Sequence, residues 1–189
     1  MGAISYRNAE YPVRSEYDEC HSRFWDRLAS SGCWLTAAQK VAVARELRHA
    51  HDCELCQARK VALSPYQVPG THDTVSGDLT ESMVEVVHRI VTDPARLTRK
   101  WFDDLVSGGL TPEVYVEILG TLVHTLVIDE FCRGLGMPLN DLPVPQPGDR
   151  QRHHRPGQAP AAVVDGLVRA TGVQGTVWRY RQPVHPLGS

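Results

Sequence analysis

The sequence predicts an all-α protein, a helical bundle of about six helices with a Pro-rich C-terminal arm. Three observations lead to this prediction. Capping residues precede most runs of helical apolar spacing, strand-like alternation is rare, and one long run is apolar on nearly every face. We expect the helical domain to span residues 15–142, and the linker and arm to span residues 143–189.

The first two helices are each expected behind a polar cap. Ser15 is placed to cap the first helix, which Gly32 should end. Thr36 and Gln39 have the spacing of a capping box, in which each side chain satisfies a free backbone N–H of the other residue. The second helix should therefore begin directly after Thr36.

The third helix is expected to carry a pair of cysteines. Asp52 can cap a short helix that includes Cys53 and Cys56 and stops before Pro65. A loop rich in turn-forming residues follows over residues 64–76.

Two further helices have start signals of the same kind. Asp78 and Glu81 form an acidic variant of the capping box ahead of an apolar run. Asp93 followed by Pro94 is typical of a cap with proline at the first helical position, and this helix should run to Gly108.

The longest helix should extend over about residues 113–133, behind Thr111 and Pro112. A helix without a polar face is usually buried in the core or at a subunit interface, so we expect a homo-oligomer. In the arm, residues 161–170 are expected to form a short helix and residues 176–181 an extended segment.

Length, charge and cysteine count exclude several classes of protein. The 189 residues carry 20 Lys and Arg against 22 Asp and Glu, a net charge of −2 that creates no attractive field for nucleic acid. No run approaches the ~20 apolar residues that span a membrane. Five cysteines, an odd number, argue against a disulfide-stapled secreted domain. We therefore expect a cytoplasmic protein with neither nucleic acid nor membrane as partner.

The two cysteines three residues apart are the most informative feature of the sequence. At the start of a helix they lie on one face, close enough to form a disulfide. Free backbone N–H groups and the positive end of the helix dipole favour the thiolate there. A thiolate is both a nucleophile and a metal ligand, so the position suits redox chemistry or metal binding.

The context of the pair resembles the alkylhydroperoxidase D-like, carboxymuconolactone decarboxylase-like superfamily, in a branch with Cys-x-x-Cys. The resemblance covers about residues 20–148. It rests on these segments: Leu35-Thr36, residues 45–47, residues 53–56, residues 63–66, His88-Arg89-Ile90, Trp101, residues 115–117 and residues 127–129.

The resemblance implies an all-helical fold that assembles into trimers or hexamers. It also implies that the two cysteines reduce a peroxide, with a histidine four residues after the pair and a glutamate about twelve before it. This chain has Lys60 and Val41 at those two positions. The nonredox decarboxylase members lack the cysteine pair, so their activity is the weaker alternative.

Other residues must therefore supply the proton relay that a reacting thiol needs. Glu46 lies two helical turns before Cys53, and His88 lies on the next long helix. We expect Cys53, Cys56, Glu46 and His88 to form the catalytic site. Lys60 is a second-tier candidate, as a cation that could lower the pKa of a cysteine.

The longest helix carries polar residues that need hydrogen-bond partners. Glu117, Thr121 and His124 share one face, and Asp129 follows five residues after His124. They could line the active site or tie subunits together, and the sequence does not choose between these roles.

Metal binding is the rival interpretation. Two Glu-x-x-His pairs, Glu46 with His49 and Glu85 with His88, are half the ligand set of a di-iron carboxylate bundle. A second option is zinc with these four ligands: His49, His51, Cys53 and Cys56. A third class is a noncatalytic oligomeric module whose arm binds a partner.

The redox interpretation is the one we favour from the sequence. A thiolate would attack a peroxide or a disulfide, and the second cysteine would resolve the product. A thiol electron donor protein would then reduce the disulfide, and no bound cofactor is required. Helix geometry favours Cys53 as the attacking residue, because it should be the more exposed of the two, whereas the resemblance implies Cys56.

Overall fold

The computed structural model describes residues 4–150, 167–169 and 178–180, and the chain divides into two units, residues 1–152 and residues 153–189. Within the described part of the first unit, every regular element is an α-helix or a 3-10 turn, which confirms the all-α bundle. The α-helices are α1 (Ser15–Leu28), α2 (Ala37–His49), α3 (Glu54–Val61), α4 (Glu81–Thr92), α5 (Arg99–Ser107) and α6 (Pro112–Gly134), and the 3-10 turns are η1 (Pro65–Gln67) and η2 (Pro94–Arg96).

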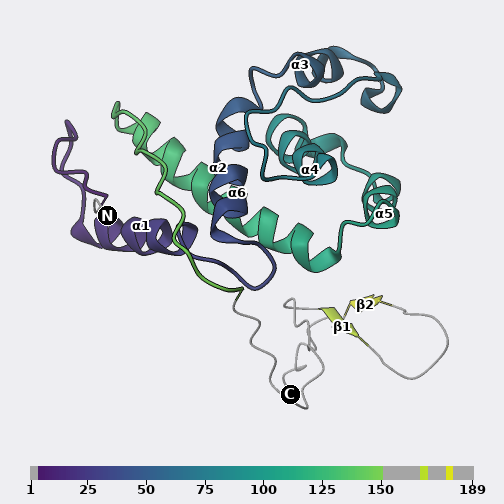
Figure 1. Cartoon of the computed structure of the whole chain (residues 1–189). Coiled ribbons are helices and arrows are strands. Elements are labelled where there is room, and N and C mark those ends of the chain that lie inside the picture. Colours follow the sequence, from purple (N-terminus) through teal and green to yellow (C-terminus); the bar gives the residue numbers. More distant parts are fainter. Residues whose placement is uncertain (1–3, 151–166, 170–177, 181–189) are drawn as a thin grey trace, which may run out of the picture. The chain divides into compact units, whose positions relative to one another are not determined.

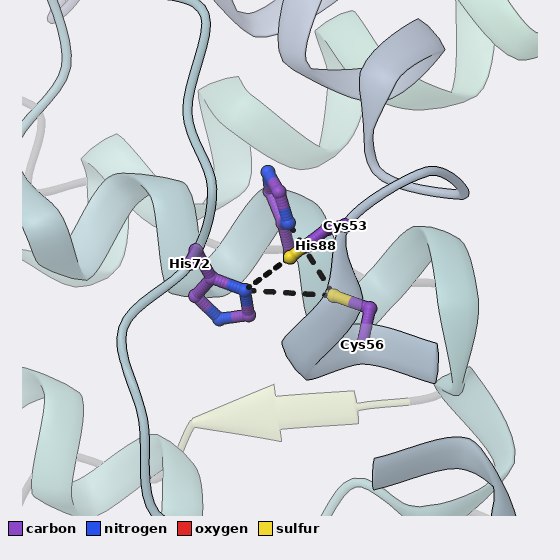
Figure 2. A group of neighbouring side chains, drawn as sticks. All are labelled: Cys53, Cys56, His72 and His88. Atoms are coloured by element: carbon purple, nitrogen blue, oxygen red, sulfur yellow. Dashed lines mark hydrogen bonds between the residues drawn. The ribbon is translucent and has the colours of Figure 1, made fainter. Parts of the chain in front are cut away.

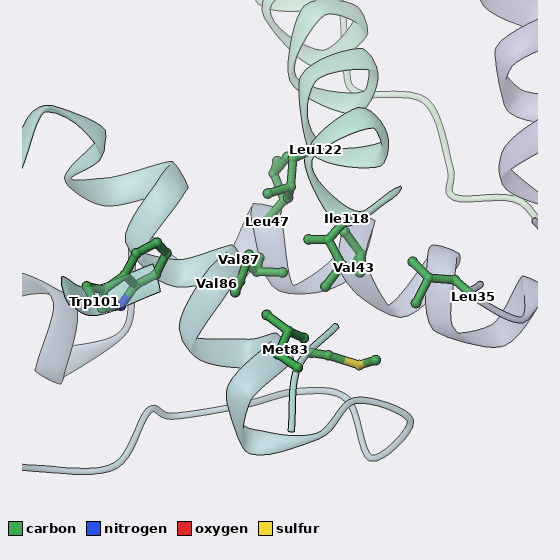
Figure 3. Close-up of a cluster of buried hydrophobic side chains, with 10 residues drawn as sticks. Leu35, Val43, Leu47, Met83, Val86, Val87, Trp101, Ile118 and Leu122 are labelled. Carbon is green, nitrogen blue, oxygen red and sulfur yellow. The ribbon is translucent and has the colours of Figure 1, made fainter. Parts of the chain in front are cut away.

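Helices α2, α4 and α6 pack against one another and form the centre of the bundle (Figure 1). The main apolar cluster lies between them and takes Trp101 from α5 (Figure 3). Val43, Val86 and Ile118 supply one fully buried side chain from each of the three helices. Burial of such side chains stabilises the frame that holds the cysteine-bearing helix α3.

A second apolar cluster joins the N-terminal segment to α1 and to the end of α6. Ile4 and Tyr6, which precede the predicted domain start at residue 15, are almost fully buried in it. Past the predicted domain end at residue 142, the Gln146 N–H donates to the Ala29 carbonyl oxygen at 2.8 Å, and the Ser31 hydroxyl donates to the Gly148 carbonyl oxygen at 2.7 Å. The helical unit is therefore larger at both ends than residues 15–142.

Two of the predicted helix starts are confirmed by the structure. The capping box of Thr36 and Gln39 is present in full. Thr111 accepts a hydrogen bond from the Val114 N–H, and α6 begins at Pro112 as expected. In contrast, Ser15 is the first residue of α1 rather than its cap, and that helix ends at Leu28 rather than at Gly32.

None of the three acidic residues predicted as caps binds the first turn of its α-helix through its side chain. Cys53, and not Asp52, precedes the first residue of α3. Thr80, and not Asp78, caps α4. Asp93 binds Arg89 and Arg96 instead of a backbone N–H, so the chain makes only the turn η2 before α5 starts afresh.

Helix α6 is buried on one side, where Ile118, Leu122 and Ile128 pack into the bundle. Its other side leaves Val116 64% and Val127 55% exposed. No described helix is long and apolar enough to cross a membrane.

The second unit contains an antiparallel pair of short strands, β1 (Leu167–Arg169) and β2 (Trp178–Tyr180), in which Leu167 lies opposite Tyr180. A strand over Leu167–Arg169 overturns the predicted helix in that part of residues 161–170. The extended segment predicted over residues 176–181 contains β2. The remaining residues of both predictions lie outside the described ranges.

Candidate thiol and imidazole site

The start of α3 positions the two cysteines. Cys53 is the residue that precedes the helix, and Cys56 lies in its first turn. Both are free thiols, and Cys53 is 0% and Cys56 4% exposed. The premise that Cys53 is the more exposed of the two is therefore wrong. Because both cysteines are covered by protein, even a small oxidant can reach the sulfurs only after the covering side chains are displaced.

His88 reaches the cysteines from α4. Its Nδ1 lies 3.3 Å from Cys56 Sγ, and its Nε2 lies 3.0 Å from Glu46 Oε2 on α2. Glu46 and His88 are both 0% exposed. Glu46 Oε1 also accepts hydrogen bonds from the Thr74 hydroxyl at 2.6 Å and from the Val75 N–H at 2.9 Å. The carboxylate is thereby held in one position behind the imidazole.

His72 reaches the same sulfurs from the loop between η1 and α4, as Figure 2 shows. Its Nδ1 lies 3.5 Å from both Cys53 Sγ and Cys56 Sγ. Its Nε2 lies 2.7 Å from Glu85 Oε2. Glu85 in turn accepts hydrogen bonds from Arg59 Nη1 at 2.8 Å and from Trp101 Nε1 at 3.0 Å.

The sequence interpretation missed His72 because the residue lies in a loop without periodicity. One signal was available. The order Cys53, Cys56, His72, His88 is two cysteines followed by two histidines, a donor set that binds zinc in many small sites.

The protonation states follow from these contacts. Burial would lower the pKa of His72, but hydrogen bonds to Cys56, Glu85 and Cys53 outweigh it and raise that pKa to about 10. Burial likewise opposes the ionised form of Glu85, yet hydrogen bonds from His72, Trp101 and Arg59 lower its pKa to about 2. In the metal-free protein, Glu85 and His72 form an ion pair beside the sulfurs.

His88 differs from His72 in charge. Burial lowers the pKa of His88 more than the hydrogen bond to Glu46 raises it, so its imidazole is neutral at pH 7. The pKa of Glu46 is lowered, because its hydrogen bonds to Thr74, His88 and the Val75 N–H outweigh burial. An ionised Glu46 accepts a hydrogen bond from His88 Nε2–H, which leaves the Nδ1 lone pair directed at Cys56.

Four donor atoms converge in this site. The sulfurs of Cys53 and Cys56 and one ring nitrogen each of His72 and His88 all lie within 4.8 Å of one another. Among the described residues this is the one group of three or more such side chains close enough to bind a single metal ion.

The structure thus brings together the four residues predicted for the catalytic site. The relative placement of the Glu-x-x-His pairs differs from that expected of a di-iron centre. Glu46 and Glu85 contact the outer nitrogens of two different histidines, His88 and His72, and His49 Nε2 lies 3.4 Å from Asp73 Oδ2. His49 and the exposed His51 stand outside the group of four donors.

The second-tier candidates lie elsewhere in the molecule. Lys60 is exposed on α3, and His124 is exposed on α6, where its ring stacks on Phe24 at 4.8 Å. Glu117 accepts a hydrogen bond from the Trp34 N–H at 2.7 Å. These contacts are structural.

Asp129 also has a structural partner. Its two carboxylate oxygens accept from Arg48 Nε at 2.8 Å and Nη2 at 2.7 Å, a bidentate pair that joins α2 to α6.

Comparison of the chain with family models, with curated proteins and with solved structures gives no match.

Proposed function

We propose that this protein is a cytoplasmic thiol-dependent oxidoreductase that uses Cys53 and Cys56 to reduce a peroxide. One observation carries the proposal. Cys56 Sγ, the His88 imidazole and the Glu46 carboxylate form an unbroken chain of contacts of 3.3 and 3.0 Å, buried throughout. A nucleophile, a base and a group that orients the base are the parts required for covalent catalysis by a thiol.

The chain of contacts supports Cys56 as the cysteine that attacks first. Its thiol proton passes to His88 Nδ1, and the thiolate attacks one oxygen of the peroxide. The S–O bond forms as the O–O bond breaks, and the departing alkoxide takes the proton back from His88. Cys56 is then a sulfenic acid and the peroxide has become an alcohol.

Cys53 completes the oxidation. Its sulfur attacks the sulfenic acid sulfur, the S–S bond forms, and the hydroxyl leaves as water with the Cys53 thiol proton. The backbone N–H groups of Cys56 and Asp73 and the His72 ring lower the pKa of Cys53 against the opposing effect of burial. An external thiol donor then restores the dithiol with two electrons.

Burial favours a peroxide over a protein disulfide as substrate. Cys53 and Cys56 are at most 4% exposed, so a folded partner cannot contact either sulfur without local opening. A hydroperoxide is small enough to enter after a small displacement of the covering side chains.

Thiol counting tests the proposal. The reduced, metal-free chain should lose two thiols per equivalent of hydroperoxide, and peptide mapping should find a disulfide between Cys53 and Cys56. A Cys20→Ser/Cys33→Ser background removes the two exposed cysteines that would confuse the count. Loss of thiols only at Cys132, or no loss under a tenfold excess of peroxide, would refute the proposal.

A further inference from the structure

The four converging donors have an additional property that the redox cycle does not require. We infer that the reduced protein binds one zinc ion through Cys53 Sγ, Cys56 Sγ, His72 Nδ1 and His88 Nδ1. The metal site itself is independent of the redox chemistry, whereas its regulatory consequence, described below, rests on the proposed function.

The donor types select the metal. Two thiolates and two imidazoles form a common tetrahedral zinc set, whereas magnesium and calcium take oxygen ligands. Within the described residues, the nearest carboxylates bond to the outer nitrogens of the histidines and not to the centre of the group.

The distances fit a tetrahedron around one ion. With Zn–S of about 2.3 Å and Zn–N of about 2.0–2.1 Å, the S···N edge of a tetrahedron is about 3.5–3.6 Å. Three of the four distances between a sulfur and an imidazole nitrogen in the site are 3.5, 3.5 and 3.3 Å, and the four donor atoms all lie within 4.8 Å of one another. Figure 2 shows both rings turned with Nδ1 toward the sulfurs.

The outer contacts are those of histidines that bind a metal. Each imidazole presents Nδ1 to the centre and Nε2 to a carboxylate, His88 to Glu46 and His72 to Glu85. A carboxylate on the far nitrogen fixes the tautomer that leaves the inner lone pair free and raises its basicity. A thiol relay needs one such histidine, and this site has two.

The metal would also fasten the loop that carries His72. Residues 68–76 contribute only Val68 as an apolar side chain packed against the cysteine cluster. A bond from His72 to an ion held by α3 and α4 would fix this loop against the bundle.

Metal binding and peroxide reduction through the His88 relay exclude each other. His88 Nδ1 cannot be a ligand and accept the Cys56 proton at the same time. All four positions around the ion are filled by protein, so no site remains for a water or a substrate. In the zinc form, the dithiol is therefore protected from rapid oxidation by peroxide.

Slow oxidation of that form would release the ion. Two zinc-bound thiolates, one hydrogen peroxide and two protons give one disulfide, two waters and free Zn²⁺. The sulfurs lose two electrons and the peroxide gains them.

Titration of the full-length, reduced chain with Zn²⁺ and Co²⁺ tests the inference. We expect one equivalent to bind, with cobalt spectra that show tetrahedral coordination and thiolate charge transfer. His72→Ala, Cys53→Ser and Cys56→Ser should each weaken binding by more than about 100-fold, the upper limit for loss of an outer hydrogen-bond partner. His49→Ala and His51→Ala are the matched controls and should bind like the wild type.

The disulfide form of the wild-type chain avoids any concern about misfolded variants, and it should bind no metal at this site. Glu46→Gln separates the two proposals, because it removes the relay carboxylate but keeps all four ligands. It should retain one equivalent of Co²⁺ with affinity reduced about 10–100-fold. Failure of the wild type to bind one equivalent, or equal losses in His49→Ala and His72→Ala, would overturn the metal site and leave the peroxide chemistry untouched.

Discussion

Replacing Asp93 by asparagine should destabilise the protein strongly, because it removes the counter-charge of a buried arginine. Arg89 is 2% exposed, and its Nη1 donates to Asp93 Oδ2 at 2.9 Å. The same carboxylate accepts from Arg96 Nε at 2.8 Å. Arg96 extends the network to α3, where it donates to the carbonyl oxygens of Arg59 and Ala62.

The expected loss can be worked out from burial. Breaking a buried ion pair by removing one partner costs about 3–5 kcal/mol, since the other charge stays buried. Asparagine keeps the shape and one oxygen acceptor, so we expect about 3 kcal/mol. At a urea m-value of ~2 kcal/mol/M, the unfolding midpoint should fall by about 1.5 M.

Asp103→Asn is the matched control. Asp103 pairs with Arg99 at the same spacing of four residues, but these side chains are 53% and 80% exposed. Such pairs contribute little, and this variant should lose less than about 0.5 kcal/mol. Equal losses for Asp93→Asn and Asp103→Asn, measured by tryptophan fluorescence in urea at pH 7, would refute the reasoning.

The pH dependence gives a second test of the same pair. Burial opposes ionisation of Asp93, but hydrogen bonding from Arg96 and the charges of Arg89 and Arg96 outweigh it, so its pKa lies below the ordinary 3.8. A carboxyl with a depressed folded-state pKa stabilises the protein above the unfolded pKa and loses this effect as the pH falls through the folded value. The difference between wild type and Asp93→Asn should therefore shrink below pH 3.8.

Two further predictions concern the core and the assembly. Ile118→Ala should lower the free energy of unfolding by about 2–5 kcal/mol, because loss of the fully buried side chain would leave a cavity between α2, α4 and α6. Val116→Ala, at an exposed position, should change the free energy of unfolding by less than about 0.5 kcal/mol. Similar losses for the two variants in urea melts would contradict this assignment of the core. Light scattering should give a mass of about three or six times the chain mass of 21.0 kDa. The double variant Val123→Glu/Val127→Glu should have the mass of one chain, because the exposed apolar face of α6 is the expected contact between subunits. A wild-type mass of 21.0 kDa would exclude the oligomer.

The parts of the fold that the sequence predicts well depend on local signals. The capping box at Thr36 and the Thr111-Pro112 start of α6 involve residues close in the chain, so a short window contains all of the interaction. Asp93 shows the limit of such signals. A cap and an ion pair compete for one carboxylate, and the outcome depends on Arg89, whose burial is a property of the whole bundle.

The candidate site divides in the same way. The cysteine pair is visible as a motif, and the sequence points to Glu46 and His88 because the positions implied by the resemblance hold Val41 and Lys60. Glu46 and His88 lie 42 residues apart in the chain, and their contact is visible only in the folded structure. His72 has no helical register to indicate its direction, and only the folded loop brings it to the sulfurs.

The rate of thiol oxidation in Glu46→Gln tests the central claim most directly. Reduced, metal-free wild type and variant are mixed with hydrogen peroxide in single-turnover stopped flow, with His49→Ala as the control for a nearby histidine outside the chain of contacts. If Glu46 holds His88 as the base for Cys56, Glu46→Gln should oxidise at least ~10²-fold more slowly, while His49→Ala should match the wild type. A Glu46→Gln rate within about threefold of the wild type, in a variant with an unchanged unfolding midpoint, would contradict the account.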